Sequence, residues 1–205
     1  MRSLASFLSI LLHPLWMPTK LVALCFVFDA HLSFNFGPLG PWIITGMVFI
    51  MTGIFPLTSA LLMLRSGMIG DLTMPLRQER IPVYMLSLIY YGMGYWLLRR
   101  TPNHPELLSL FFGGALALLF TLLITLRWKI SAHMVGIGGV LGAIIAIQLL
   151  HGAPVVALIA LLLLLTGALG SARLLISDHT PAQVYMGALL GLLLVMGCGL
   201  VGLAP

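Results

Sequence analysis

The stretch "LLLLLTGALGSARLLISDHTPAQVYMGALLGLLLV", residues 161–195, places a polar segment between two long apolar runs. A helix needs about 20 mostly apolar residues to cross a bilayer. The runs over 154–172 and 182–203 are long enough, so the segment between them predicts the turn of a transmembrane helical hairpin. Polar side chains at the ends of apolar spans are costly, so the arginine, aspartate, histidine and glutamine in this turn indicate a function.

The rest of the chain has the same apolar character. Of its 205 residues, 60% are hydrophobic and 7% are charged, whereas a soluble domain has about 25% charged residues. We therefore expect an integral membrane protein with an all-α fold, a polytopic bundle of six to seven spans in a single membrane domain. An interfacial segment is expected over 1–17, and the expected spans are roughly 18–34, 41–64, 82–100, 106–127, 132–150, 154–172 and 182–203.

The charges restrict the partners of this protein. The formal net charge is +5, but the basic residues are dispersed among apolar spans, which excludes nucleic acid as a partner. Positive charge then has two uses, setting the topology against anionic lipid or holding an anionic headgroup. Both cysteines lie in apolar runs, and their number and positions suggest neither a disulfide framework nor a metal cluster.

The polar connections predict where a functional site lies. They cover 65–82, 127–133 and 171–181, after the second, fourth and sixth expected spans, so they meet at one end of the bundle. The ionisable side chains expected at this end are Arg65, Asp71, Arg77, Glu79, Arg80, Arg127, Lys129, His133, Arg173, Asp178 and His179. Arg65 and Arg127 are expected as topology anchors at the membrane surface. The remaining histidines, His13, His31, His104 and His151, are expected as ordinary interface residues.

Glycines within the spans predict close helix packing. The run "GIGGVLG" (136–142) lies within an apolar span and follows no strand, so it is not a nucleotide-binding loop. Gly187 and Gly191 lie in the last expected span.

Three motifs in the polar connections resemble those of the type-2 phosphatidic acid phosphatases. They are "RQERIP" (77–82), "KISAH" (129–133) and "SARLLISDHTPAQ" (171–183). The family has the signatures Lys-x6-Arg-Pro, Pro-Ser-Gly-His and Ser-Arg-x5-His-x3-Asp in this order. The third matches best, because Arg173 and His179 enclose five residues.

The chain departs from each signature. Gln183 stands in the place of the family's Asp, and Ile130 and Ala132 replace the Pro and Gly of the second signature, which Ser131 and His133 match. In the first signature, an isoleucine separates Arg80 from the proline and the expected lysine is a threonine, so Arg77 is an alternative ligand.

The resemblance implies a phosphatase of lipid phosphates or pyrophosphates that acts through a phosphohistidine, without metal or cofactor. His179 would be the nucleophile, His133 the general acid, and Gln183 the group that orients His179. The implied phosphate-binding residues are Arg77, Arg80, Lys129, Ser131 and Arg173. Because Gln183 carries no charge, a carboxylate from Asp178, Asp71 or Glu79 is a candidate helper.

The residues around His179 support part of this interpretation without the family. Thr180-Pro181-Ala182-Gln183 has the pattern of a helix start, with Thr as the N-cap, Pro in the first position and Gln three residues after the cap. His179 would then lie at the N-terminus of the last span, where free backbone N–H groups favour an anion. Gln183 has two alternative roles, as the partner of His179 or only as part of the cap.

The function and the orientation have alternatives. A catalytically silent protein of the same family type that binds or scaffolds lipid phosphates would keep the same cationic residues. The substrate class is a polyprenyl pyrophosphate, phosphatidic acid or phosphatidylglycerol phosphate, and the oligomeric state stays open. The excess of Lys and Arg at the motif end predicts that this end is cytoplasmic. The resemblance is to bacterial-type members of the family and implies a protein of the cytoplasmic (inner) membrane. It also implies an extracytoplasmic site, so the orientation stays open.

Overall fold

The computed structural model describes residues 2–34, 36–101, 105–177 and 179–202. Within these ranges every regular element is a helix, and seven helical stretches are long and apolar enough to cross a membrane. The protein is therefore an integral membrane protein with an all-helical fold, which confirms that part of the prediction. The elements are α1 (Arg2–Leu11), η1 (Pro14–Trp16), α2 (Met17–Phe28), α3 (Ala30–Phe34), α4 (Gly40–Phe49), η2 (Ile50–Ile54), α5 (Phe55–Arg65), α6 (Arg77–Arg99), α7 (Pro105–Thr125), α8 (Ala132–His151), α9 (Val156–Ile176) and α10 (Pro181–Val201).

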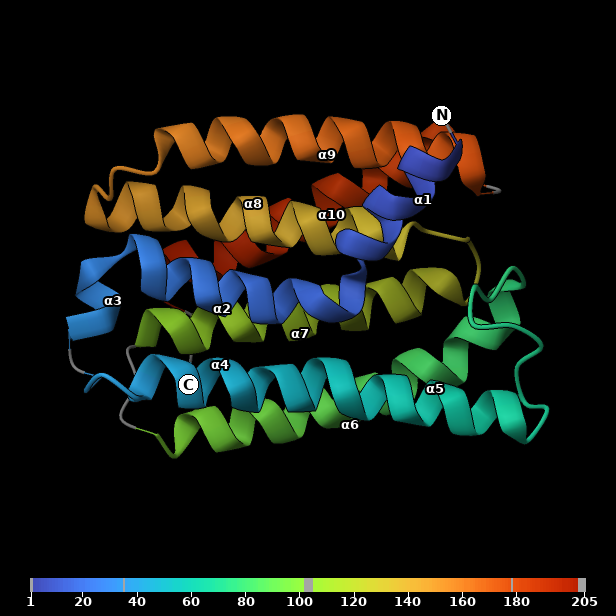
Figure 1. Ribbon diagram of the computed structural model, residues 1–205, viewed down its shortest axis with the longest axis horizontal. Coiled ribbons are helices and arrows are strands. Elements are labelled where there is room, and N and C mark those ends of the chain that lie inside the picture. Colours follow the sequence, from blue (N-terminus) through green and yellow to red (C-terminus); the bar gives the residue numbers. More distant parts are fainter. Residues whose placement is uncertain (1, 35, 102–104, 178, 203–205) are drawn as a thin grey trace.

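The long helices lie side by side and alternate in direction (Figure 1). The connections over 66–76 and 126–131 lie at the same end of the bundle as the N-terminal helix, and α9 ends and α10 begins at this end too (Figure 1). The prediction that the polar connections meet at one end is confirmed. The alternation follows from the short connections. After a short turn, the next helix must re-enter the membrane beside the helix that has just ended, in the opposite direction.

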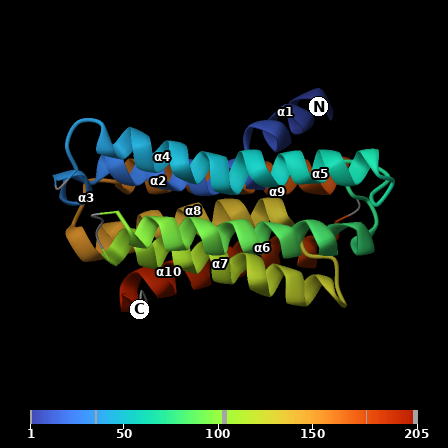
Figure 2. The same ribbon diagram turned by 90° about the horizontal axis from the view of Figure 1, so that it is seen from below.

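The first helical stretch differs most from the prediction. The stretch that is long enough to span begins at Arg2 and ends at Phe28, instead of covering 18–34. Pro14 interrupts it, and α1, before this point, is inclined to α2 (Figure 2) and packs against α9. Ala5 and Ser9 are the buried residues of α1, and its exposed side chains include Leu4, Phe7, Ile10 and Leu11.

The closest helix pair in the bundle is α8 and α10, and glycines make the approach possible. A Cβ on Gly191 would lie 2.0 Å from the carbonyl oxygen of Val135, and a Cβ on Gly138 would lie 2.2 Å from that of Ala188. No real side chain tolerates such distances, so only glycine fits at these crossings. The prediction that these glycines serve helix packing is confirmed.

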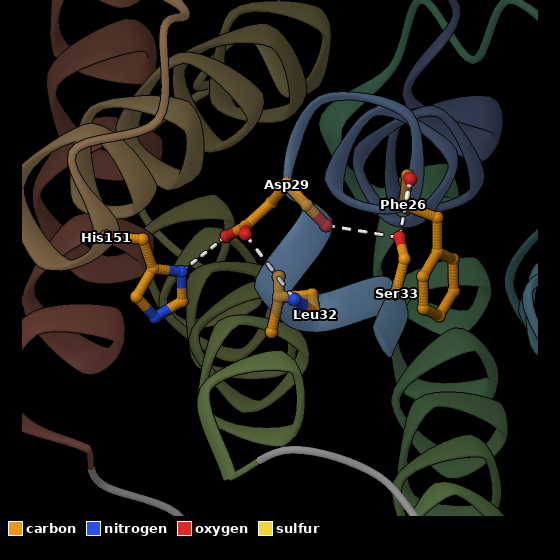
Figure 3. Close-up of polar contacts among 5 residues, drawn as sticks. All are labelled: Phe26, Asp29, Leu32, Ser33 and His151. Atoms are coloured by element: carbon orange, nitrogen blue, oxygen red, sulfur yellow. Dashed lines mark hydrogen bonds and ion pairs between the residues drawn. The ribbon is translucent and has the colours of Figure 1, made fainter. Parts of the chain in front are cut away.

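A polar cluster ties α2 to α8 at the end of the bundle opposite the three connections. The Asp29 carboxylate, at the C-cap of α2, pairs with Nδ1 of His151, the last residue of α8 (Figure 3). The other carboxylate oxygen of Asp29 accepts from the backbone N–H of Leu32 at 3.4 Å. The Ser33 hydroxyl donates to the carbonyl oxygen of Phe26 at 2.6 Å. His151 was expected as an ordinary interface residue, and the structure gives it this structural role.

Candidate functional site

A cavity of about 320 Å³ opens at the end of the bundle where the three connections meet, and its polar end is cationic. Five basic side chains from separate parts of the chain line it: His13, Arg80, His133, Arg173 and His179. The remaining wall is mostly apolar and comes from α2, α5, α6, α7 and α8. The cavity therefore has a cationic end and a hydrocarbon-like body.

His179 lies just before α10, and its ring is fixed by Gln183. It is 8% exposed, and its Nδ1 lies 3.1 Å from the side-chain oxygen of Gln183. The backbone N–H of Thr180 donates to the same oxygen, also at 3.1 Å. A backbone N–H can only donate, so the Gln183 atom that faces both partners is the carbonyl oxygen. Nδ1 of His179 therefore carries the hydrogen, and Nε2 keeps a free lone pair.

The same contacts form the start of α10. The Thr180 hydroxyl accepts from the backbone N–H of Gln183 at 3.4 Å, which completes a reciprocal capping box with Pro181 in the first helical position. The sequence left two roles open for Gln183, capping the helix or holding His179. The structure shows both contacts at once, because one amide oxygen accepts from both groups.

The environment keeps the His179 imidazole uncharged at neutral pH. Burial lowers the pKa of His179 to about 4, against the opposing effect of its hydrogen bond with Gln183. The positive charges of Arg80, Arg173 and Lys129 also lower this pKa. An uncharged imidazole with a free Nε2 is the form that can act as a nucleophile.

His133 is held by the N-terminal helix. Its Nε2 lies 3.1 Å from the carbonyl oxygen of Ser9 in α1, so Nε2 carries a hydrogen in this contact. The ring of His13 packs edge-on against that of His133, with ring centroids 5.1 Å apart and planes at 80°. Ser9 and His13 are the site residues that the sequence analysis missed. The signal was the polar His13-Pro14 pair inside an otherwise apolar stretch.

Arg173 and Arg80 supply the permanent charges of the cavity. Nη1 of Arg173 donates weakly to the Ser9 hydroxyl at 3.4 Å, and its Nε is buried without a hydrogen-bond partner among the described residues. Nε of Arg80 donates to the carbonyl oxygen of Met74 at 2.9 Å, and Arg80 is only 8% exposed. Buried guanidinium groups need anionic or polar partners, so this end of the cavity is suited to an anion.

Three of the expected phosphate ligands do not line the cavity. Nη1 of Arg77 donates to the carbonyl oxygen of Leu126, outside the cavity. Ser131 is fully buried, its backbone N–H donates to the carbonyl oxygen of Gln183 at 3.3 Å, and its hydroxyl has no partner among the residues described. Lys129 acts on His179 through its charge without lining the cavity.

Two of the three expected carboxylate helpers are also placed elsewhere. Glu79 accepts from the backbone N–H groups of Gly70 at 2.8 Å and Leu76 at 3.3 Å, so it organises the connection before α6. Asp71 is exposed and accepts from the backbone N–H of Thr73, a bond that lowers the pKa of its carboxyl. Asp178 lies outside the described residues, as does His104. Among the residues that the structure describes, no carboxylate lines the cavity.

We compared the chain with known proteins in three ways. Family models, curated proteins and solved structures all gave no match. Within the described residues no group of three His, Cys, Asp or Glu side chains is placed to hold a metal ion. What the site offers is a set of fixed positive charges beside a neutral imidazole, at the end of an apolar cavity.

Proposed function

We propose that this protein hydrolyses lipid phosphates or pyrophosphates through a phosphohistidine on His179. The observation that carries the proposal is the position of His179, whose neutral Nε2 shares the cationic end of an apolar cavity with Arg80, His133 and Arg173. An amphiphile with a phosphoryl headgroup matches both parts of this cavity. The sequence resemblance to type-2 phosphatidic acid phosphatases assigns the same residues to the same roles.

The first chemical step is the transfer of the phosphoryl group to His179. Arg80 and Arg173 bind the phosphoryl oxygens, because a guanidinium can donate to two oxygens at once. Nε2 of His179 attacks phosphorus with its lone pair, and the bond between phosphorus and the leaving oxygen breaks. The negative phosphoryl group favours a second proton, taken up from solvent, on Nδ1 of His133, and His133 then gives this proton to the leaving oxygen.

The second step regenerates the enzyme. His133, now with one proton fewer, accepts a proton from water, and the resulting hydroxide oxygen bonds to phosphorus as the bond between phosphorus and Nε2 breaks. Inorganic phosphate leaves, and His179 returns to its neutral form. The fixed charges of Arg80 and Arg173 stabilise the phosphoryl oxygens in both steps.

The replacement of the family's Asp by Gln183 does not give His179 the wrong hydrogen placement. In the Ser-His-Asp triad, the corresponding change from Asp to Asn costs about 10⁴ in rate because it favours the wrong tautomer of the histidine. Here the Thr180 N–H orients the amide of Gln183 so that its oxygen faces Nδ1 of His179. The tautomer is therefore correct, and only the negative charge is missing.

A second candidate function is binding of lipid phosphates without turnover. The observation that favours it is that His179 has an amide as its partner and that no described carboxylate lines the cavity. Such a protein would bind the headgroup through Arg80 and Arg173 and release no phosphate.

Phosphate release from purified protein in lipid nanodiscs tests the proposal. The substrates are a polyprenyl pyrophosphate, phosphatidic acid and phosphatidylglycerol phosphate, and the variants are His179→Ala, Arg173→Gln and the control Arg127→Gln. Arg127 is an exposed arginine at the same end that does not line the cavity. We expect His179→Ala to abolish release, Arg173→Gln to reduce it at least tenfold, and Arg127→Gln to leave it unchanged.

Trapping separates the two candidate functions. Wild-type protein quenched during turnover of a radiolabelled substrate should carry acid-labile label that His179→Ala lacks. Binding of these lipids without any phosphate release or label would refute the enzyme and support the binding protein.

A further inference from the structure

The apolar part of the cavity runs along the bundle instead of across it. On α6 its lining residues are Arg80, Val83, Tyr84, Ser87 and Tyr91, which share one face of the helix. Tyr91 is 11 positions after Arg80, which corresponds to about 16 Å at a rise of about 1.5 Å per residue. The face of α7 from Thr121 to Phe111 lines the cavity over a similar length.

This depth matches one leaflet of a membrane. The hydrocarbon core of a bilayer is about 30 Å thick, so a cavity about 16 Å deep reaches from the headgroup region to the middle of the bilayer. A lipid whose phosphate lies between Arg80 and Arg173 would therefore place its chain along the cavity within its own leaflet.

The volume of the cavity restricts how many hydrocarbon chains a bound lipid can place in it. Small-molecule sites range from about 300 to 1,000 Å³, and this cavity, at about 320 Å³, is at the lower end. The phosphoryl group takes part of that space. We expect the remainder to hold one hydrocarbon chain, whereas the two chains of a diacyl lipid would have to share it.

Two aromatic rings lie at the inner end of the cavity. The rings of Tyr91 and Phe111 stack with centroids 5.6 Å apart and planes at 27°. Phe111 is 2% exposed, and a Cβ on Gly94 would lie only 3.1 Å from its Cζ, so the ring has little freedom to move away. A lipid chain that enters from the cationic end meets these two rings after about 16 Å, roughly the thickness of the hydrocarbon region of one leaflet.

We propose that the cavity selects phosphates or pyrophosphates of single-chain lipids, and that Tyr91 and Phe111 set the longest chain that it holds. This inference rests on the proposed function for the headgroup chemistry, but the chain selection belongs to binding and does not require turnover. Of the substrate classes considered, it favours the polyprenyl type over the diacyl type.

Competition binding in nanodiscs tests the chain selection without turnover. A fluorescent single-chain lipid phosphate is displaced by monoalkyl phosphates from hexyl to octadecyl, and by phosphatidic acid, at equal mole fractions in the membrane. We expect affinity to rise with chain length up to a limit and to fall for longer chains, which the inner end of the cavity does not accommodate. Phosphatidic acid should compete at least tenfold more weakly than the best monoalkyl phosphate.

Two variants should move the limit in opposite directions. A Cβ on Gly114 would have only Cε1 of Tyr91 within 4 Å, at 3.9 Å. The side chain of Gly114→Val therefore fills part of the cavity beside Tyr91, and this variant should favour shorter chains. Phe111→Ala removes part of the inner end and should admit longer chains. The control is Gly92→Val, at an exposed glycine of α6 where an added Cβ would have no atom within 4 Å. It should change nothing.

The outcomes separate this inference from the proposed function. Equal competition by phosphatidic acid, or a limit that does not shift in Gly114→Val, would overturn the chain selection even if the protein releases phosphate. The predicted limit and its shift would support the chain selection even if no phosphate is released. Gly114→Val also provides the test if Phe111→Ala does not fold.

Discussion

Replacing Gln183 with glutamate supplies the charge that the site lacks with almost no change in shape. Glutamate keeps the capping box at the start of α10, because its oxygens accept from the same backbone N–H. It places a negative charge about 3.1 Å from Nδ1 of His179, the distance of the present amide oxygen. Two opposite unit charges at this distance interact by about 5 kcal/mol at an effective dielectric constant of about 20.

That interaction sets the size of the expected change. One pKa unit corresponds to about 1.4 kcal/mol, so the charge alone could raise the pKa of His179 by almost four units. The cost of burying the new carboxylate and the nearby arginines reduce this, and we expect a rise of at least about two units. Because the wild-type pKa is lowered to about 4, His179 in Gln183→Glu should titrate at about pH 6 or above.

Two measurements check this prediction. Titration of isotope-labelled histidines by NMR in detergent gives the pKa of His179, assigned by its loss in His179→Ala. Phosphate release should be at least tenfold faster in Gln183→Glu than in wild type, because the carboxylate stabilises positive charge on the phosphorylated imidazole. An unchanged pKa for His179 would refute the contact with Gln183 from which the tautomer was argued. The control Gln183→Met should lose about 1–3 kcal/mol of stability, because Nδ1–H is left without its acceptor in a buried site.

Three further predictions concern packing, the opposite end of the bundle and pH. Gly191→Ala should lower the free energy of unfolding by about 1–3 kcal/mol, because the added Cβ meets a backbone oxygen of α8. The control Gly197→Ala should leave it unchanged, because an added Cβ there has no atom within 4 Å. Thermal unfolding in detergent measures both variants. Asp29→Ala should cost about 1–3 kcal/mol by the same assay, since it removes the buried partner of His151, and should leave lipid-phosphate binding unchanged at the far end. The pKa of His179 is lowered to about 4 in the folded protein, against an ordinary 6.5, so between pH 4 and 6.5 the unfolded chain binds more protons than the folded protein does. Stability should therefore fall as pH drops from 6.5 towards 4, and His179→Gln should weaken this dependence in thermal unfolding measured across that range.

Short-range patterns predicted the local structure of the site well. The helix start at Thr180-Pro181, with Gln183 as its capping partner, was predicted and is confirmed, because these contacts join residues within three or four positions. The apolar runs predicted most of the spans for a similar reason, since the length of a membrane helix depends on its own composition. The boundary at the N-terminus was harder, because Pro14 bends the first stretch without ending it.

The identity of the cavity's side chains was not available from local patterns. Arg77 and Arg80 lie in the same turn of α6, yet only Arg80 lines the cavity, since the rotation of α6 against its neighbours decides which side chain faces inward. Ser9 reaches His133 across 124 positions of the chain, through the packing of α1. No spacing rule connects such distant residues.

Three features can be predicted from the amino-acid sequence: the chain crosses the membrane as apolar helices, its polar connections gather at one end, and a capped helix begins directly after His179. Those features follow from composition and from contacts between near neighbours in the chain. Three other features require the packed bundle: which basic side chains share the cavity, which way the amide of Gln183 faces, and how deep the apolar part of the cavity is. These depend on the rotation and close approach of helices such as α8 and α10, which side-chain volumes from the whole bundle set together.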